Sequence, residues 1–165
     1  MNREFNLIDL HTHSTASDGS YSPKDLVSLA DKASLCVIAL TDHDTMSGVE
    51  ECFNAGVKLG INVIPGIEMS CVYKEKEIHI LGYLLPDSIS QKEIHISKEI
   101  ISDLEFFSNE RAKRNEEIIK RFADDNIIID KRDLYAADPH AQITRAHFAN
   151  VLIKMGIVNN KSEAF

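Results

Sequence analysis

The chain has 165 residues, of which 44% are hydrophobic and 27% charged, a composition that suits one folded domain and excludes a largely disordered chain. Its formal net charge of −8 argues against a surface that coats nucleic acid, although bound cations can still draw an anionic substrate to an acidic site. No apolar run suits a membrane span, no secretory signal precedes the first polar motif, and the three cysteines are sparse. We therefore expect a cytoplasmic protein.

Strands and helices alternate in the first part of the chain. The four predicted strands are, in order, FNLIDL, VIALT, INVIPGIEMS and EIHILGYLL. Two helices separate the first three: SPKDLVSLADKA, with Ser22 as N-cap and Pro23 at its first position, and SGVEECFNAGVKLG, which ends at Gly60. This strand–helix–strand order predicts parallel pairing and the α/β class.

Helices are predicted after Pro86. From about Glu93 to Asp125 the chain has no Pro or Gly. Apolar side chains recur there with helical spacing, at Ile101, Leu104, Phe107, Ile118 and Phe122. Two further short helices are expected over DKRDLYAA and ITRAHFANVLIKMG. Residues 87–165 are thus predicted to form a helical segment that follows the sheet.

Histidine and carboxylate side chains recur at or near the ends of the predicted strands. His11 and His13 end the first strand, where residues two apart share a face, so both imidazoles can reach one point. This pair alone is a weak signal for a metal. Asp18 follows in an Asp-Gly sequence that is also typical of a turn.

The second strand is followed at once by Asp42, His43 and Asp44. Two acids around a histidine are unusual for a simple turn, and a histidine ligand needs a partner on its other nitrogen. We therefore expect Asp42 and Asp44 to orient ligands, and Asp44 also suits the N-cap of the next helix.

The third and fourth strands add Glu68 and His79. A carboxylate at the end of an apolar strand must be paired or ligated, whereas a histidine inside one is as readily a hydrogen-bonded core residue. Because C-terminal strand ends build the active sites of α/β proteins, four strands with such groups predict a metal centre. Mixed His and carboxylate ligands favour Zn, Mn or Fe over Ca.

Two arginines are candidates for binding an anion. Arg111 lies within the apolar stripe of the long predicted helix, where an arginine either extends its charge to solvent or meets an anion. Arg114, on an adjacent side of this helix, is expected to be a surface charge. Thr144 and Arg145 lie at a predicted helix start, where a phosphate is stabilised.

The segments HTHSTASDGSYSP, IALTDHDTMSG, IPGIEMS and IHILGY resemble, in order and spacing, the motifs of the polymerase and histidinol phosphatase (PHP) domain. The resemblance is nearest to the bacterial nucleoside 3′,5′-bisphosphate phosphatases. It implies a distorted (β/α)7 barrel with a helical insertion over a centre of two or three divalent ions. The metal ligands that it implies are His11, His13, Asp18, His43, Glu68 and His79.

The resemblance also implies phosphate contacts from Arg111 and Arg145, with Thr144 beside them. Two positions depart from the family pattern: Ala146 stands where Pro is frequent, and Ser108 replaces a basic residue one helical turn before Arg111. The second departure bears on how the phosphates of a substrate are held.

The implied domain plan divides the chain into three parts. Residues 1–86 are expected to be the N-terminal half of the PHP barrel with the metal motifs, residues 87–150 the insertion over the site, and residues 151–165 the start of the return to the barrel. The later Ala-His-Pro-like and Asp-x-His-like motifs of the family are missing, so the barrel is expected to be truncated before its last strands. An open barrel edge predicts pairing with a second copy.

The predicted function is hydrolysis of a phosphate monoester of a nucleotide or similar small molecule, by a hydroxide held on Mn, Zn or Fe ions. One alternative is a PHP-type exonuclease, which the acidic charge disfavours. A histidinol phosphatase is another, which the TDHD motif and the helical insertion disfavour. A third is a non-catalytic metal-binding fragment or assembly module. The expected partner is a small phosphorylated substrate, with no membrane and no stable binding of double-stranded DNA.

Overall fold

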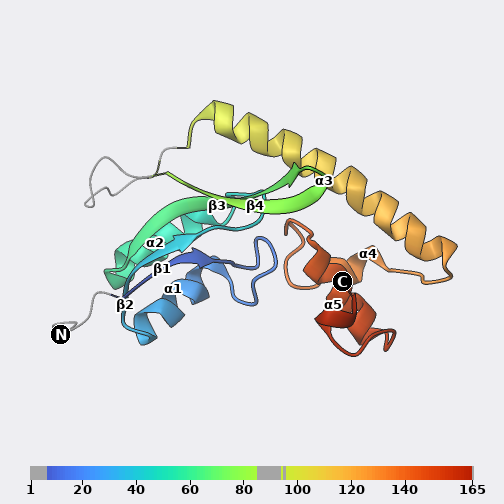
Figure 1. Ribbon diagram of the computed structural model, residues 1–165. Helices are drawn as coiled ribbons and strands as arrows, with labels where there is room; N and C mark the ends of the chain where they lie inside the picture. Colours follow the sequence, from blue (N-terminus) through green and yellow to red (C-terminus); the bar gives the residue numbers. More distant parts are fainter. Residues whose placement is uncertain (1–6, 85–93, 95, 165) are drawn as a thin grey trace.

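The computed structural model describes residues 7–84, 94 and 96–164 (Figure 1). The predicted strand ends at Phe5 and Leu85 lie outside the described residues. The predicted boundary between residues 86 and 87, and the predicted helix start at Glu93, lie outside them as well.

Four strands form one sheet in the order β1-β2-β3-β4. The strands are β1 (Leu7–Thr12), β2 (Leu35–Leu40), β3 (Asn62–Tyr73) and β4 (Lys76–Tyr83). The first three pair in parallel, and helices α1 (Pro23–Lys32) and α2 (Val49–Leu59) connect them, as the sequence predicts. The hydroxyl of Tyr83 donates a 2.8 Å hydrogen bond to the carbonyl oxygen of Leu10, so the sheet curls until its first and last strands approach each other. This curled half-barrel confirms the predicted α/β fold.

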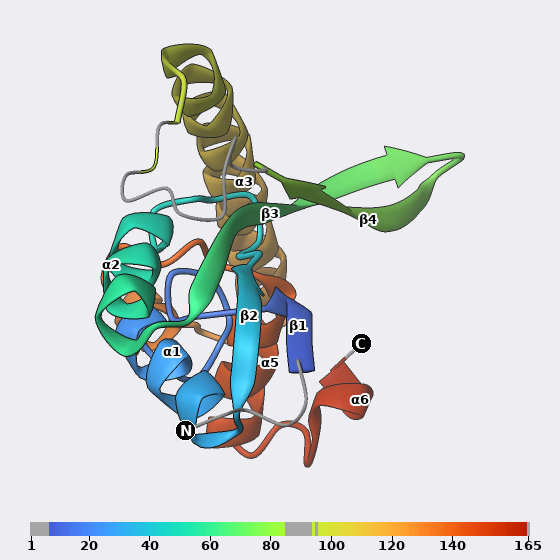
Figure 2. The same cartoon turned by 90° about the vertical axis from the view of Figure 1, so that its left-hand side faces the viewer.

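The pairing of β4 differs from the prediction. It runs antiparallel to β3, with His79 opposite Ser70. The two residues between these strands, Lys74 and Glu75, both have positive φ, 49° and 64°, which is typical of a tight hairpin turn. The prediction of parallel pairing is therefore wrong for this strand, and His79 comes from mid-strand rather than from a C-terminal strand end. The hairpin projects from the body as an arm (Figure 2).

Predicted capping residues are confirmed for α1 and α2. The side chain of Ser22 accepts a hydrogen bond from the backbone of Asp25, and Gly60 ends α2 with a φ of 70°. The N-cap of α2 is Gly48, without a side-chain hydrogen bond. The alternative of Asp44 as the N-cap is therefore wrong, and its carboxylate is available for another contact.

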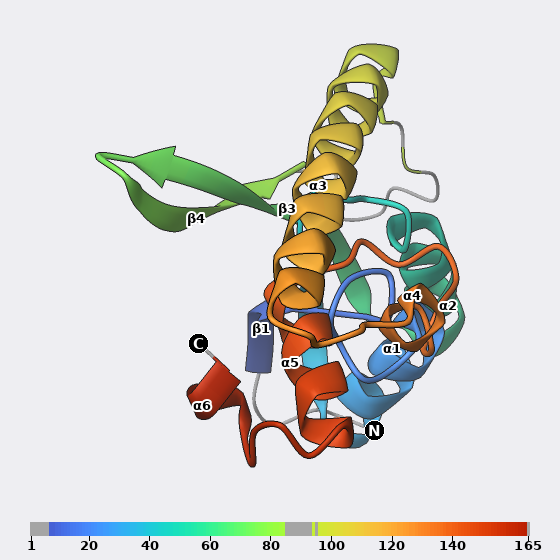
Figure 3. The same cartoon turned by 90° about the vertical axis from the view of Figure 1, so that its right-hand side faces the viewer.

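Helices α1 and α2 bury one face of the sheet, and helix α3 (Lys98–Asp124) crosses the molecule beside the sheet (Figures 1 and 3). Leu104 in its first half packs against the core of sheet, α1 and α2, whereas Phe122 in its second half stacks on Phe148 in a separate core. The second core contains α4 (Lys131–Leu134) and α5 (Arg145–Lys154), and α6 (Lys161–Ala164) follows. In the described part of the chain, no helix combines the length and apolarity needed to cross a bilayer.

Candidate metal centre

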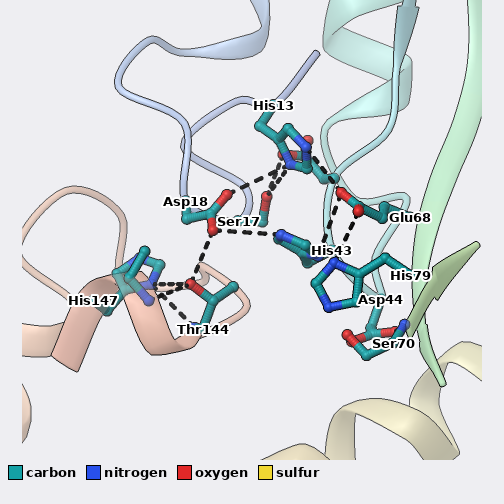
Figure 4. Close-up of polar contacts among 12 residues, drawn as sticks. His13, Ser17, Asp18, His43, Asp44, Glu68, Ser70, His79, Thr144 and His147 are labelled. Atoms are coloured by element: carbon teal, nitrogen blue, oxygen red, sulfur yellow. Dashed lines mark hydrogen bonds and ion pairs between the residues drawn. The ribbon is translucent and has the colours of Figure 1, made fainter. Parts of the chain in front are cut away.

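Six histidine and carboxylate side chains converge at one end of the curled sheet, five of them labelled in Figure 4. The four imidazoles form a row in which neighbouring ring centroids are 4.8–5.1 Å apart. The six come from β1 (His11), the loop after β1 (His13, Asp18), the loop after β2 (His43), β3 (Glu68) and β4 (His79). Every metal ligand predicted from the sequence is thus brought into one cluster.

The carboxylate of Glu68 lies at the middle of this row and is only 5% exposed. Its Oε2 is 3.0 Å from Nε2 of His11, 3.0 Å from Nε2 of His13 and 3.6 Å from Nδ1 of His43. Its Oε1 is 2.9 Å from Nδ1 of His79. One buried carboxylate therefore faces all four imidazoles.

The cluster resolves into three groups whose ligand atoms lie within 4.8 Å of one another. The groups are His11, His13 and Glu68; His13, Asp18 and His43; and His43, Glu68 and His79. Neighbouring groups share residues, so cations held by them would be adjacent. Nδ1 of His43 is buried and has no hydrogen-bond partner among the described residues. This unsatisfied nitrogen and the mixed N and O donor set fit a divalent transition metal.

Asp18 links the cluster to the C-terminal helices. Its Oδ1 and Oδ2 are each 3.5 Å from an imidazole nitrogen, of His13 and His43 respectively. Its Oδ2 also accepts a 3.0 Å hydrogen bond from Oγ1 of Thr144. Thr144 is the N-cap of α5 and forms a capping box with His147. The start of α5 is therefore fixed directly against the metal cluster.

Asp42 orders the loop that carries His13 and Asp18. It is buried, and it accepts hydrogen bonds from the backbone of Ser14 (2.8 Å), the hydroxyl of Ser14 (2.7 Å) and the hydroxyl of Ser17 (2.6 Å). Burial raises the pKa of this carboxyl group, although the same three hydrogen bonds oppose the rise. These contacts orient the loop between two ligand candidates, in line with the supporting role expected for Asp42.

Asp44 pairs with Arg111. Asp44 has a φ of 51°, in the left-handed region, and its Oδ1 accepts a 2.7 Å hydrogen bond from the backbone of Ser70. Its Oδ2 meets the buried guanidinium of Arg111. Of the two alternatives for Arg111, extension to solvent or contact with an anion, the structure has the second, and the anion is the chain's own carboxylate. Burial lowers the pKa of Arg111 to about 10, so it keeps its charge at neutral pH.

The electrostatics of the cluster suit ligand chemistry. Burial lowers the pKa of His43 and outweighs the opposing charges of Asp18 and Glu68, so its imidazole is neutral near pH 7, as metal binding requires. Burial alone would raise the pKa of Glu68. The hydrogen bond from His11 and the nearby imidazole charges reverse this and hold the pKa below its ordinary range. Glu68 is therefore ionised at neutral pH.

A cavity of about 190 Å³ opens beside the cluster. His43 and His79 line it together with Arg111, Arg114, Arg145 and the N-terminus of α5. Arg114 is half-buried there, and burial lowers its pKa. The prediction that Arg114 is a surface charge is therefore wrong. Arg114 lies one turn after Arg111 on α3, and both side chains line the same cavity.

Three contributing residues were not singled out in the sequence. Glu77 lies 2.9 Å from Nη1 of Arg145 and 3.2 Å from Nε2 of His79, and Ser70 and Ser17 bind groups around the ligands. Glu77 precedes His79 by two residues, and Ser70 follows Glu68 by two. Strand alternation from the predicted ligands would have indicated both, since residues two apart share a face.

This fold and this cluster define an α/β protein with a His and carboxylate centre suited to divalent metals. A family model described as "PHP domain" matches residues 9–155, and the chain belongs to this family. The likeness to PHP motifs in the sequence is thereby confirmed.

The relatives of the chain include hydrolases of RNA and of nucleotides. It is 36% identical over 157 residues to a 5′-3′ exoribonuclease of Haemophilus influenzae, and this match covers 95% of this chain and 54% of that protein. It is 37% identical over 75 residues to a 3′,5′-nucleoside bisphosphate phosphatase of Chromobacterium violaceum, a match that covers 46% of this chain and 26% of that protein. The chain thus spans about half the length of the relative that it matches throughout.

Solved structures agree with this fold. An amidohydrolase from Chromobacterium violaceum, with bound sulfate and no metal, superimposes with a TM-score of 0.82 at 26% identity, covering 96% of this chain and 53% of that one. A protein from Bifidobacterium adolescentis assigned as a metal-dependent phosphoesterase gives a TM-score of 0.80 at 28% identity, with the same two coverages. The half-barrel therefore corresponds to part of a larger fold in both.

Proposed function

We propose that this chain carries the metal centre of a phosphoester hydrolase that hydrolyses a phosphate monoester of a nucleotide or similar small molecule and releases inorganic phosphate. The observation that supports this most is the convergence of six metal-type ligands beside a cavity lined by three arginines. A metal site without positively charged side chains beside it would suit a purely structural metal. Arg114 and Arg145 supply positive charge and N–H donors for the phosphate groups of a substrate.

The proposed ligands are His11, His13, Asp18, His43, Glu68 and His79, and their three overlapping groups support two or three ions, of Mn, Zn or Fe. When bound, such ions lower the pKa of a water molecule and orient the phosphoryl group.

The side chains around the ligands bind and orient. Arg114 and Arg145 offer guanidinium groups to the phosphate, and Thr144 places the N-terminus of α5 beside them. Neutral His43 stays available as a nitrogen donor because its imidazole is buried. Asp42 supports the loop from His13 to Asp18 through its hydrogen bonds with Ser14 and Ser17.

A 5′-3′ exoribonuclease is the second candidate, and one observation favours it. The match to such an enzyme covers 95% of the chain, whereas the match to the bisphosphate phosphatase covers 46%. Both reactions place a ribonucleotide phosphate at a metal centre, so the same ligands and arginines serve either one.

The test is hydrolysis by the 165-residue chain in Mn²⁺, with a chelator control. The substrates are a nucleoside 3′,5′-bisphosphate and a 5′-phosphorylated oligoribonucleotide. Release of inorganic phosphate from the first supports the phosphatase, and release of nucleoside monophosphates from the second supports the exoribonuclease. Equal rates for wild type and His13→Ala, or full activity in chelator, would contradict both.

We also propose that the reaction takes place in the cytoplasm. All three cysteines are free thiols, and burial raises the pKa of Cys52 to about 12. Reduced, widely spaced cysteines are typical of cytoplasmic proteins.

A further inference from the structure

We propose that Arg111 is a positioning residue, which fixes the geometry of the metal centre through Asp44, Ser70 and the carbonyl of Ile143, and that phosphate is bound by the other two arginines. The inference rests on the proposed function, because it assigns a part to a residue beside that same site. It differs from the phosphate contact that the family resemblance implies for this arginine.

The guanidinium of Arg111 is already engaged by the chain itself. Arg111 and Asp44 are each only 8% exposed. Nη2 of Arg111 donates to Oδ2 of Asp44 and, at 2.6 Å, to Oγ of Ser70. Nη1 donates to the carbonyl oxygen of Ile143 at 3.4 Å. These three acceptors belong to three separate segments of the chain.

The first two acceptors adjoin predicted ligands. Asp44 directly follows His43, and its backbone N–H donates to the carbonyl oxygen of Glu68 at 3.0 Å. Ser70 follows Glu68 by two residues on the same strand, and its own N–H donates to Asp44 at 2.7 Å. Arg111 therefore closes a network that sets the distance between the His43 loop and strand β3.

The third acceptor connects the network to the opposite side of the centre. Ile143 precedes Thr144, whose hydroxyl donates to Asp18. Asn115, one turn after Arg111 on α3, donates to the same carbonyl oxygen at 3.2 Å. One helix thus holds the segments that carry His43, Glu68 and the partner of Asp18, which explains why α3 lies against the site.

The chemistry of arginine suits this task. Its planar guanidinium presents donors in several fixed directions, whereas a lysine ammonium is a point charge on a flexible stem. A buried Asp44 without its cation would carry an uncompensated charge next to His43.

The other two arginines are better placed for a ligand. Arg114 donates to Asn115 through Nη2, but its Nε has no hydrogen-bond partner among the described residues. Arg145 pairs with Glu77, but its side chain is half exposed, whereas that of Arg111 is buried.

The test is a double-mutant cycle on metal affinity, with Arg111→Met, Asp44→Asn and the double variant. Arg121→Met is the matched control, because it makes the same change on an exposed face of α3. Calorimetric titration with Mn²⁺ gives the metal Kd, titration of the Mn²⁺-loaded protein with inorganic phosphate gives the anion Kd, and thermal melts report folding.

Arg111→Met and Asp44→Asn should each raise the Mn²⁺ Kd about 10–100-fold, the range for residues that orient metal ligands. The Mn²⁺ Kd of the double variant should be no higher than that of the single variant that binds Mn²⁺ more weakly, because both changes break one network. Arg121→Met should stay within about twofold of wild type. Ser70→Ala leaves the pair of Arg111 and Asp44 intact and should raise the Mn²⁺ Kd several-fold. It replaces the Arg111 variants in the test if those do not fold.

An unchanged Mn²⁺ Kd in folded Arg111→Met, or additive effects in the double variant, would overturn the proposal. So would a loss confined to the phosphate titration, which is what a direct phosphate contact predicts. If the Arg111 variants do not fold, an unchanged Mn²⁺ Kd in Ser70→Ala would overturn it. A wild-type chain that binds no Mn²⁺ would overturn the proposed function and this proposal with it. The failures are distinguishable, because the results above overturn only the role of Arg111 and require a wild type that binds Mn²⁺.

Discussion

Gly19 offers the sharpest structural test of the loop that carries two of the proposed ligands. It directly follows Asp18, and its N–H donates to the carbonyl oxygen of Ser14 at 2.9 Å, which turns the loop back on itself. A Cβ atom at this position would lie 2.2 Å from the carbonyl oxygen of His13 and 2.7 Å from Cα of Ser14. Both are backbone atoms, so no side-chain rotation relieves the overlap.

Gly19→Ala must therefore open the loop by about 1 Å to restore ordinary contact. Overpacking of this kind reduces the free energy of unfolding by about 1–3 kcal/mol. Because the opening separates His13 from Asp18, the Mn²⁺ affinity should also fall, by about 10–100-fold.

Gly60→Ala is the matched control. Gly60 has a φ of 70°, and a Cβ atom added to it would meet no atom within 4 Å, so alanine there is strained but does not collide. It should reduce stability by about 1–2 kcal/mol and leave metal binding unchanged. Urea unfolding and Mn²⁺ titration of both variants give the answer. The reasoning is refuted if Gly19→Ala binds Mn²⁺ as tightly as Gly60→Ala does.

Three further predictions concern thiols, pH and the cavity. Cys52 should react with a thiol reagent at pH 8 at least about tenfold more slowly than the other two thiols, measured by mass spectrometry, because burial raises its pKa to about 12. Burial lowers the pKa of His147 from its ordinary 6.5, so His147 is protonated at a higher pH in the unfolded chain than in the folded one. The stability that neutral His147 contributes is therefore present above pH 6.5 and is lost as the pH falls below it. His147→Gln, which preserves a capping box with Thr144, should make chemical unfolding less pH-dependent in that window, and an unchanged dependence would contradict this. Glu77→Gln removes a negative charge beside Arg145 and should tighten phosphate binding about two- to fivefold in a titration; weaker binding would show that Glu77 supports the anion site instead.

Local signals in the sequence predicted much of the fold. Ser22, Pro23 and Gly60 define helix ends through backbone chemistry that depends on few neighbours, and the structure confirms all three. The antiparallel pairing of β4 was missed because Lys74 and Glu75 form a tight turn without the Gly or Asn that usually indicates one.

The site was predicted in composition but not in its contacts. His13 was predicted at the end of the first strand and lies in the loop just after β1. Glu68 was predicted at the end of the third strand, but β3 continues to Tyr73 and Glu68 lies within it.

The partner of Arg111 could not be predicted, because Asp44 is 67 positions away and the two meet only through tertiary packing. Arg114 was misplaced for the same reason: helical geometry gives the angle between two residues but not the surface that each one faces.

The central claim is that these side chains bind divalent cations together, and the most direct measurement is the Mn²⁺ content of the chain after equilibrium dialysis. Glu68 belongs to two of the three ligand groups, whereas Glu105, exposed on α3, belongs to none, so Glu68→Gln and Glu105→Gln form a matched pair. The wild type and Glu105→Gln should retain at least one Mn²⁺ per chain, and Glu68→Gln should retain markedly less. Equal Mn²⁺ content in all three proteins would contradict the account.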